Sequence, residues 1–163
     1  MVPMIAMEVV GVRVEMPSNQ PIVLLKEIDG QRFLPIWVGA SEATAIAFAQ
    51  QGVQPPRPLT HDLMTSLFEL FEVELNLVEL TEIKDGVFYS TIHFTNSELE
   101  HVSISSRPSD AIALAIRASS KIFASEELLN EIGLEIPEVE GENQEIEKFK
   151  EFLDQITPED FLG

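Results

Sequence analysis

Apolar residues alternate with polar ones, or form short runs rich in valine and isoleucine, along much of the first 125 residues. This pattern is typical of β-strands. Two pairs of runs are joined by Asp29-Gly30 and Asp85-Gly86, a dipeptide that favours a tight type I′ hairpin turn. The predicted strands cover residues 4–14, 22–28, 31–38, 75–83, 87–94 and 101–105, with 121–124 as a further edge strand.

Four segments between or after the strands have helical features, and they cover residues 41–51, 61–71, 108–118 and 125–133. Ser41, Thr60 and Ser125 are predicted N-caps, because a short hydroxyl side chain accepts a hydrogen bond from a free N–H group of the first turn. Pro108 suits the first turn of its helix. In the second helix the apolar side chains fall on one face, namely Leu63, Leu67, Leu70 and Phe71.

Two of the predicted helices resemble each other, since residues 41–48 and 109–116 are both alanine-rich and each follows a strand. Small side chains let a helix approach a sheet closely, so we expect both helices to be buried. The similarity fits either a duplicated unit or a shared demand for close packing. The fold predicted is α+β: a mixed, mostly antiparallel sheet built from β-hairpins, with alanine-rich helices packed on it and a C-terminal amphipathic helix.

The C-terminal region differs from the rest in composition. Residues 137–144 form an acidic linker, and Ile146, Phe149, Leu153 and Ile156 then recur at the spacing of an amphipathic helix. We therefore divide the chain into a domain at 1–136 and an acidic helical tail at 137–163. The helix either docks on its own domain or binds a partner or a second subunit.

Composition narrows the classes of function. The chain of 163 residues has no cysteine, which excludes disulfides, thiolate zinc sites and thiol nucleophiles. No apolar run is long enough to span a membrane, and the first residues lack a basic secretory signal, so we expect a cytoplasmic protein. The net charge of −18 opposes non-specific binding to nucleic acid. Residues 126–163 hold 13 acids against two bases, which leaves room for a basic patch on the main domain.

Two Arg-Pro dipeptides, each at a predicted helix entrance, are the most specific chemical feature. Residues 57–62 read Arg-Pro-Leu-Thr-His-Asp, and residues 106–110 read Ser-Arg-Pro-Ser-Asp. Arginine can bind a phosphate through two parallel hydrogen bonds, and histidine can move a proton near neutral pH. If the entrances meet, they form a mixed-charge pocket suited to binding or hydrolysing a phosphate; an internal salt-bridge network is the alternative. The residues concerned are Arg57, His61, Asp62, Arg107 and Asp110.

A third place with candidate chemistry is another strand-to-helix turn, which contains Glu42 shortly after the only tryptophan, Trp37. The negative charge of Glu42 in the first helical turn is stabilised by the positive end of the helix dipole. The chain has no glycine-rich phosphate loop, G-x-S-x-G or H-E-x-x-H motif. His93 and His101 lie on predicted strands, where they contribute packing or surface polarity.

The motifs at residues 57–62 and 106–115, with Leu-Pro-Ile-Trp-Val-Gly at 34–39 followed by Ser-Glu-Ala at 41–43, resemble the bifunctional nuclease domain family. The resemblance covers residues 5–135, and the acidic tail is similar to that of some bacterial members. It implies an α+β domain, usually oligomeric, in a family named for hydrolysis of both DNA and RNA.

The residues and this resemblance leave two hypotheses. The first is a metal-assisted phosphodiesterase with DNA and RNA as substrates, acting as a homo-oligomer, with a dimer as the first expectation. Its assigned residues are Asp62, Asp110 or Glu42 for Mg²⁺ or Mn²⁺, His61 for proton transfer, and Arg57, Arg107 and Ser109 for substrate binding. The second is a non-catalytic regulatory or assembly module that acts through its C-terminal helix and an oligomer interface.

Overall fold

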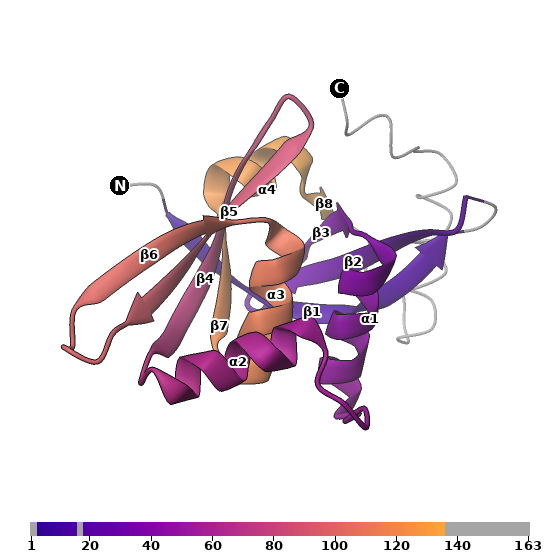
Figure 1. Ribbon diagram of the computed structural model, residues 1–163. Coiled ribbons are helices and arrows are strands. Elements are labelled where there is room, and N and C mark those ends of the chain that lie inside the picture. Colours follow the sequence, from indigo (N-terminus) through magenta and orange to yellow (C-terminus); the bar gives the residue numbers. More distant parts are fainter. Residues whose placement is uncertain (1–2, 16–17, 136–163) are drawn as a thin grey trace.

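The computed structural model describes residues 3–15 and 18–135, which form one eight-stranded sheet with four helices (Figure 1). The strands are β1 (Met4–Glu15), β2 (Gln20–Glu27), β3 (Arg32–Trp37), β4 (Glu74–Lys84), β5 (Val87–Thr95), β6 (His101–Ser106), β7 (Lys121–Ser125) and β8 (Leu134–Glu135). The helices are α1 (Ala40–Gln51), α2 (Thr60–Leu70), α3 (Pro108–Ala118) and α4 (Glu126–Ile132). The predicted α+β class is confirmed.

The sheet joins two antiparallel three-stranded units, β1-β2-β3 and β4-β5-β6, through β7. The strand order is β6-β5-β4-β7-β1-β2-β3-β8, and β7 pairs in parallel with β4 and antiparallel with β1. The prediction that residues 121–124 form an edge strand was therefore wrong. The chain crosses back through α3 before β7, and the strand fills the gap between the two units, where both of its edges find partners.

The two Asp-Gly dipeptides behave differently. Asp85 and Gly86 have φ values of 52° and 76°, the left-handed pair that a type I′ turn requires, so the tight turn predicted between β4 and β5 is confirmed. Asp29-Gly30 lies in a longer loop over residues 28–31, and neither residue has a positive φ. The tight turn predicted there was wrong, because the Glu27 carboxylate lies inside the loop, where it accepts from the Arg32 N–H and leaves no room for a Cβ atom at Gly30.

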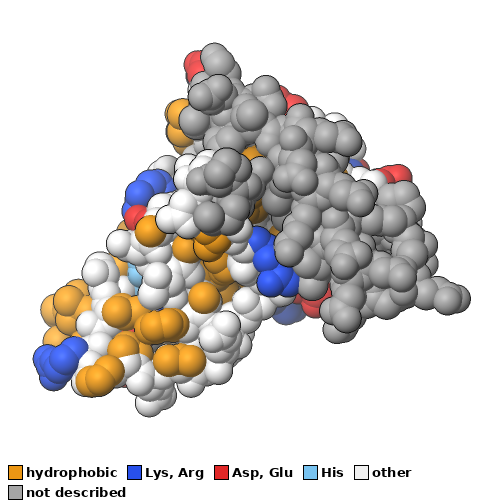
Figure 2. Space-filling view, turned by 90° about the vertical axis from the view of Figure 1, so that its right-hand side faces the viewer, with side chains coloured by type: hydrophobic (Ala, Val, Ile, Leu, Met, Phe, Trp, Pro, Cys, Tyr) orange, Lys and Arg blue, Asp and Glu red, His pale blue; other side chains and the backbone are white. Residues whose placement is uncertain are grey.

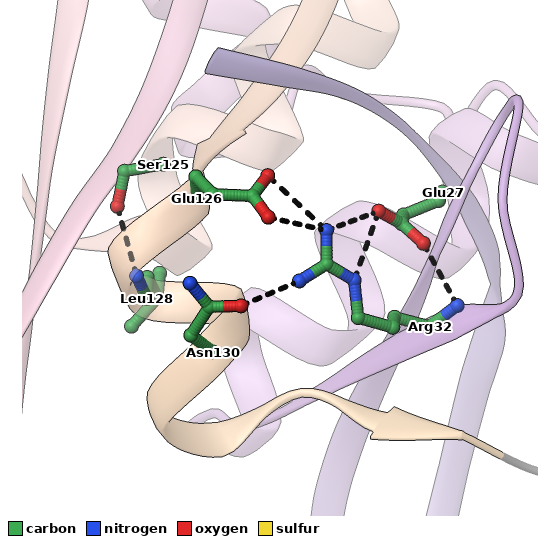
Figure 3. A network of polar contacts seen from close by, with 6 residues as sticks. All are labelled: Glu27, Arg32, Ser125, Glu126, Leu128 and Asn130. Carbon is green, nitrogen blue, oxygen red and sulfur yellow. Dashed lines mark hydrogen bonds and ion pairs between the residues drawn. The ribbon is translucent and has the colours of Figure 1, made fainter. Parts of the chain in front are cut away.

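Arg32 holds this loop and α4 together at the start of β3 (Figure 3). Its guanidinium donates to Glu27 Oε1 at 2.7 and 3.1 Å, and its backbone N–H donates to Glu27 Oε2 at 2.9 Å. The same guanidinium reaches the Glu126 carboxylate at 3.2 Å and Asn130 Oδ1 at 3.0 Å. The hydrogen bond from Arg32 outweighs partial burial and lowers the pKa of the Glu27 carboxyl.

Two helix starts agree with the sequence. The Ser125 hydroxyl accepts a hydrogen bond from the Leu128 N–H at 3.1 Å and so caps α4, as predicted. Pro108 is the first residue of α3, where its missing N–H leaves no hydrogen bond unmade.

Two predicted N-caps were wrong by one or two residues. Gly39 is the N-cap of α1, and its extended backbone places Ser41 inside the first turn rather than before it. Leu59 is likewise the N-cap of α2, so that Thr60 is the first helical residue. The Asp62 carboxylate accepts from the Leu59 N–H at 2.9 Å, which supplies one of the two bonds of a capping box without the threonine hydroxyl.

The main core lies between one face of the sheet and the helices, and α1 and α3 pack against each other there. The alanine-rich composition is what permits this contact, since small side chains let the two helices approach closely. The prediction that these helices are buried is confirmed most fully for α3. Buried helix residues include Ala43, Ala45, Ile46, Ala111, Ile112, Ala113, Leu114 and Ala115.

Helix α2 turns a different face inward than its sequence suggests. Met64 and Phe68 pack on the main core, whereas the predicted apolar face lies at the surface with 43–72% of each residue exposed. That exposed face consists of Leu63, Leu67 and Leu70 with the adjoining Phe71. Exposed hydrophobic side chains also form the orange group at the lower left of Figure 2.

A second apolar cluster lies on the other face of the sheet, and it consists of Ile22, Leu24 and Phe33 with the partly buried Trp37. The predicted linker at 137–144 and the amphipathic helix after it lie outside the described residues. Among the helices of the described chain, none is long and apolar enough to cross a membrane.

Candidate functional site

The N-terminal ends of α1, α2 and α3 meet at one pocket of about 800 Å³, closed on another side by β5 and β6. The two Arg-Pro entrances therefore contribute to a shared, open site. Polar groups line one part and apolar side chains another. The lining residues are Ser41, Glu42, Thr44, Ala45, Leu59, Thr60, His61, Met64, Phe68, Ile92, Phe94, Ile104, Ser105, Ser106, Arg107, Asp110 and Leu114.

Four of the predicted site residues form a continuous chain of contacts in this pocket. Arg107 lies between two carboxylates: its Nη2 donates to Glu42 Oε1 at 2.9 Å, and its Nε donates to Asp110 Oδ2 at 2.9 Å. The other oxygen of Asp110, Oδ1, lies 2.9 Å from Nε2 of His61. The structure thus brings together Glu42, Arg107, Asp110 and His61 from three helix entrances.

The hydrogen bonds among these groups stabilise the charged forms of Asp110 and Arg107. Partial burial raises the pKa of the Asp110 carboxyl, but hydrogen bonds from Arg107 and His61 together outweigh burial and leave the pKa below its ordinary value. The bond to Asp110, with a further one to Glu42, raises the pKa of Arg107. Asp110 is therefore an anion at neutral pH, positioned to orient the imidazole of His61.

His61 is buried. It is the second residue of α2, and the tight cap at Leu59 fixes the turn that points its ring inward. Because Asp110 faces Nε2, Nδ1 is the ring nitrogen left for exchange of a proton with a ligand.

Asp62 is not part of this chain of contacts and instead pairs with Arg117. Its Oδ1 accepts from Arg117 Nε at 2.7 Å, and this hydrogen bond outweighs burial to lower the pKa of the Asp62 carboxyl. The Arg117 side chain is largely buried and also donates to the Ala113 carbonyl at 3.0 Å. Sequence reasoning missed Arg117, although a single arginine near the end of an apolar helix is a signal that an acid faces it.

Four further polar residues do not line the pocket. Arg57 is exposed on the connector between α1 and α2, and Ser109 is buried in the first turn of α3; neither lines the pocket. His93 and His101 lie on β5 and β6, with Nδ1 of the first 2.8 Å from Nε2 of the second, and they do not line it either.

The comparison with known proteins agrees with this arrangement. The sequence model described as the bifunctional nuclease domain matches residues 23–137, a range that includes all three motifs and every residue of the pocket. The chain belongs to the bifunctional nuclease domain family. The match starts later than the sequence-based expectation of residue 5 and ends close to the expected 135.

Relatives of the chain fall into two groups. An uncharacterized protein of Mycobacterium tuberculosis is 46% identical over 160 residues, which is 94% of this chain and 95% of the relative. Proteins named bifunctional nuclease 1 from Oryza sativa subsp. japonica and Arabidopsis thaliana are each 27% identical, over 120 and 124 residues. These matches cover 72% and 74% of this chain but only 36% and 38% of the plant proteins.

A divalent cation is expected at Asp62, Asp110 or Glu42 if the metal-assisted hypothesis holds. Across residues 3–15 and 18–135, no group of three or more His, Cys, Asp or Glu side chains is arranged to hold a metal ion. Arg107 occupies an oxygen of both Glu42 and Asp110, and Arg117 occupies one of Asp62. These carboxylates, as arranged, do not fit a resident metal.

Proposed function

We propose that this member of the bifunctional nuclease domain family hydrolyses phosphodiester bonds of DNA and RNA in the pocket at the three helix entrances. One observation carries the proposal: His61, Asp110 and Arg107 form a contact chain that lines a single open pocket. The names of the plant relatives support the class of substrate.

In this proposal His61 is the proton acceptor. A water oxygen forms a bond to phosphorus, the ester P–O bond breaks, and Nδ1 of His61 takes the proton that the water loses. The leaving oxygen takes a proton from solvent. Asp110 is a positioning residue, since it fixes the ring through Nε2 and stabilises the imidazolium that forms.

Arg107 is the phosphate-binding group. Its side chain is 66% exposed, so it is free to release Glu42 and turn a donor to a phosphate oxygen. Two carboxylates share this one guanidinium, and the chain carries a net charge of −18, so the pocket has little excess positive charge for a long anionic strand. We therefore expect weak binding that depends on a few contacts at the scissile phosphate.

The apolar part of the pocket suits a nucleobase. Phe68 and Phe94 meet edge to face, with ring centroids 5.1 Å apart, beside Met64 and Ile92. A volume of about 800 Å³ lies within the range of ligand pockets and has room for a nucleotide. A base held on this side would leave its phosphate near Arg107.

The test compares His61→Gln and Arg107→Ala with Arg57→Ala as a matched control, because Arg57 is an exposed arginine outside the pocket. Purified proteins are incubated with labelled single-stranded DNA and RNA, with EDTA and with added Mg²⁺ or Mn²⁺. Removing a general base or a charged donor typically costs about 10²–10³-fold in rate. We expect such losses in the pocket variants, an unchanged rate in the control, and melting temperatures within a few degrees of wild type.

Two outcomes would contradict the proposal. Cleavage that persists in both pocket variants would come from a contaminant. Equal losses in Arg57→Ala and Arg107→Ala would place substrate binding outside the pocket. The reactions with EDTA and with added metal distinguish two cases. Cleavage in EDTA requires only the described residues, whereas cleavage that needs added Mg²⁺ or Mn²⁺ depends on a cation from solution.

One observation favours the second candidate, a non-catalytic assembly module. Helix α2 lies in the same half of the molecule as β6, an edge strand of the sheet (Figure 1), and both have exposed apolar side chains, those of Val102 and Ile104 in the case of β6. An edge strand beside apolar side chains can pair with β6 of a second copy.

The oligomer is measured by light scattering of the full chain. Leu70→Glu is expected to convert a dimer to a monomer, whereas Val87→Glu, an exposed apolar position at the β4–β5 turn, is expected to leave the dimer intact. A wild-type monomer at micromolar concentration would contradict the module hypothesis.

A further inference from the structure

We propose that residues 145–156 dock on the second apolar cluster of the same chain, as an amphipathic helix that covers the sheet face formed by Ile22, Leu24, Phe33 and Trp37. This inference is independent of the reaction proposed for the pocket. It concerns the opposite face of the sheet. It also chooses docking on the same chain over binding to a partner or a second subunit, the two possibilities that the sequence leaves open for the tail.

The pairing register places the second apolar cluster on one face. Residues directly opposite one another in a sheet point to the same side. Arg13 pairs with Ile22, which pairs with Trp37, and Lys26 pairs with Phe33 in a parallel row across the strands. All four helices contribute side chains to the main core, and within the described chain no helix contributes one to the second apolar cluster.

The cluster is nevertheless buried. Ile22, Leu24 and Phe33 are each at least 95% inaccessible to water. A single-layer sheet face without a covering element leaves large side chains open to solvent, and a face of this kind is normally packed against a second layer. An amphipathic helix is the element that most simply supplies such a layer.

The chain leaves the described structure beside this face. Phe33 pairs with Leu134 in β8, which lies next to β3 at the sheet edge (Figure 1), so the described chain ends at the margin of the cluster. Eleven residues separate Leu134 from Ile146 and can span up to about 35–40 Å when extended. Neighbouring strands are only about 4.8 Å apart, so the tail can reach across β3, β2 and β1.

The sequence of the tail matches the face in polarity, and its acids can meet two basic side chains on this side of the sheet. Its apolar seam consists of Ile146, Phe149, Leu153 and Ile156, and residues 137–163 hold nine acids against two bases. Two of the ten basic residues of the chain, Arg13 and Lys26, lie on this side of the sheet, in line with cluster residues, and Glu8 lies opposite Lys26 in the same row. The Lys26 ammonium lies 5.5 Å from the centre of the Phe33 ring, where it can meet acids that flank the seam.

Tethering favours the chain's own tail over that of a second copy. A short flexible linker holds the segment at an effective concentration of roughly millimolar near its site, which exceeds the concentration of free chains in most solutions. The docked helix would close the second side of β1, β2 and β3 and complete the three-layer packing of that half of the sheet.

The test uses the full chain with Phe149→Asp, which places a charge in the apolar seam. Gln155→Asp is the matched control, since helical spacing puts residue 155 on the opposite side of the same segment. Trp37 is the only tryptophan and reports directly on this face. We expect a shift of its emission to longer wavelength and stronger acrylamide quenching in Phe149→Asp, and wild-type spectra in the control.

A second measurement uses the absence of cysteine. Leu24→Cys is introduced into the wild-type, Phe149→Asp and Gln155→Asp chains, and the rate of thiol labelling is followed with circular dichroism as a check of folding. Because labelling requires the open state, we expect it to be at least about tenfold faster in the Phe149→Asp background. Equal labelling rates and emission spectra in all three chains would overturn the proposal.

Dilution distinguishes the source of the segment. For docking within one chain, the Trp37 signal of the wild-type protein stays constant from high to low micromolar concentration. A signal that shifts on dilution toward that of Phe149→Asp would assign the segment to a second copy and overturn docking within the chain.

Discussion

Replacing Arg32 with alanine tests whether the network in Figure 3 stabilises the fold. In the folded state the Arg32 side chain is 19% exposed and that of Glu27 is 9% exposed. Loss of one partner from a buried ion pair typically costs about 3–5 kcal/mol, because the remaining charge stays buried without compensation. The contact with the more exposed Glu126 adds at most about 1 kcal/mol.

Since neither side chain is fully enclosed, we expect the free energy of unfolding to fall by about 3 kcal/mol in Arg32→Ala. In a chain of this size each kcal/mol lowers the melting temperature by about 2–4 °C, which predicts a decrease of about 6–12 °C. Thermal and urea unfolding at pH 7 measure both quantities. Arg57→Ala, an exposed arginine for which no partner is found within the described chain, is the control and should stay within about 0.5 kcal/mol.

The effect should also depend on pH. The hydrogen bond from Arg32 lowers the folded-state pKa of the Glu27 carboxyl, so the stability it contributes is present above the unfolded pKa of about 4.3. That contribution is lost as the pH falls through the folded pKa. The difference between wild type and Arg32→Ala should therefore shrink below about pH 4.5. A variant within 1 kcal/mol of wild type at pH 7, or a difference that is constant from pH 7 to pH 3, would refute the reasoning.

Three smaller changes test other contacts. Asp62→Asn removes a carboxylate whose pKa Arg117 lowers, so it should reduce stability by about 2 kcal/mol at pH 7 but weaken the acid dependence below pH 4, as measured by urea unfolding across pH. Ser125→Ala removes the cap on the Leu128 N–H and should cost about 1–2 kcal/mol, with unchanged stability as the contrary result. Ser119→Gly should raise the free energy of unfolding by about 0.5–1 kcal/mol, because Ser119 has a φ of 53°; a lower melting temperature would contradict this.

Local sequence patterns predicted the helices and strands well, but they predicted poorly which strands pair with each other. The hairpin at Asp85-Gly86 and the cap at Ser125 depend on residues within a few positions of each other, so the sequence contains the whole interaction. The central position of β7 depends instead on pairing with β1 and β4, which lie far away along the chain. A short apolar run gives no signal that separates an edge strand from a central one.

The sequence likewise predicted some residues of the candidate site correctly and others wrongly. Residue types and Arg-Pro spacing indicated His61, Arg107 and Asp110, and the structure places these three in one pocket. Asp62 and Arg57 belong to the same short motif, yet one faces Arg117 and the other faces solvent. Helical geometry turns successive residues by about 100°, so neighbours in a motif point to different surroundings.

The sequence by itself determined the α+β composition, the alanine-rich helices and, to within two residues, the positions of the helix entrances, because propensity, capping and periodicity act over a few residues. Only the tertiary structure decided that three entrances share a pocket and that the apolar face of α2 is left outside. Those outcomes depend on which surfaces, distant along the chain, pack together in the core. The 3.6-residue period shows that one face of a helix is apolar, but it does not identify the surface on which that face packs.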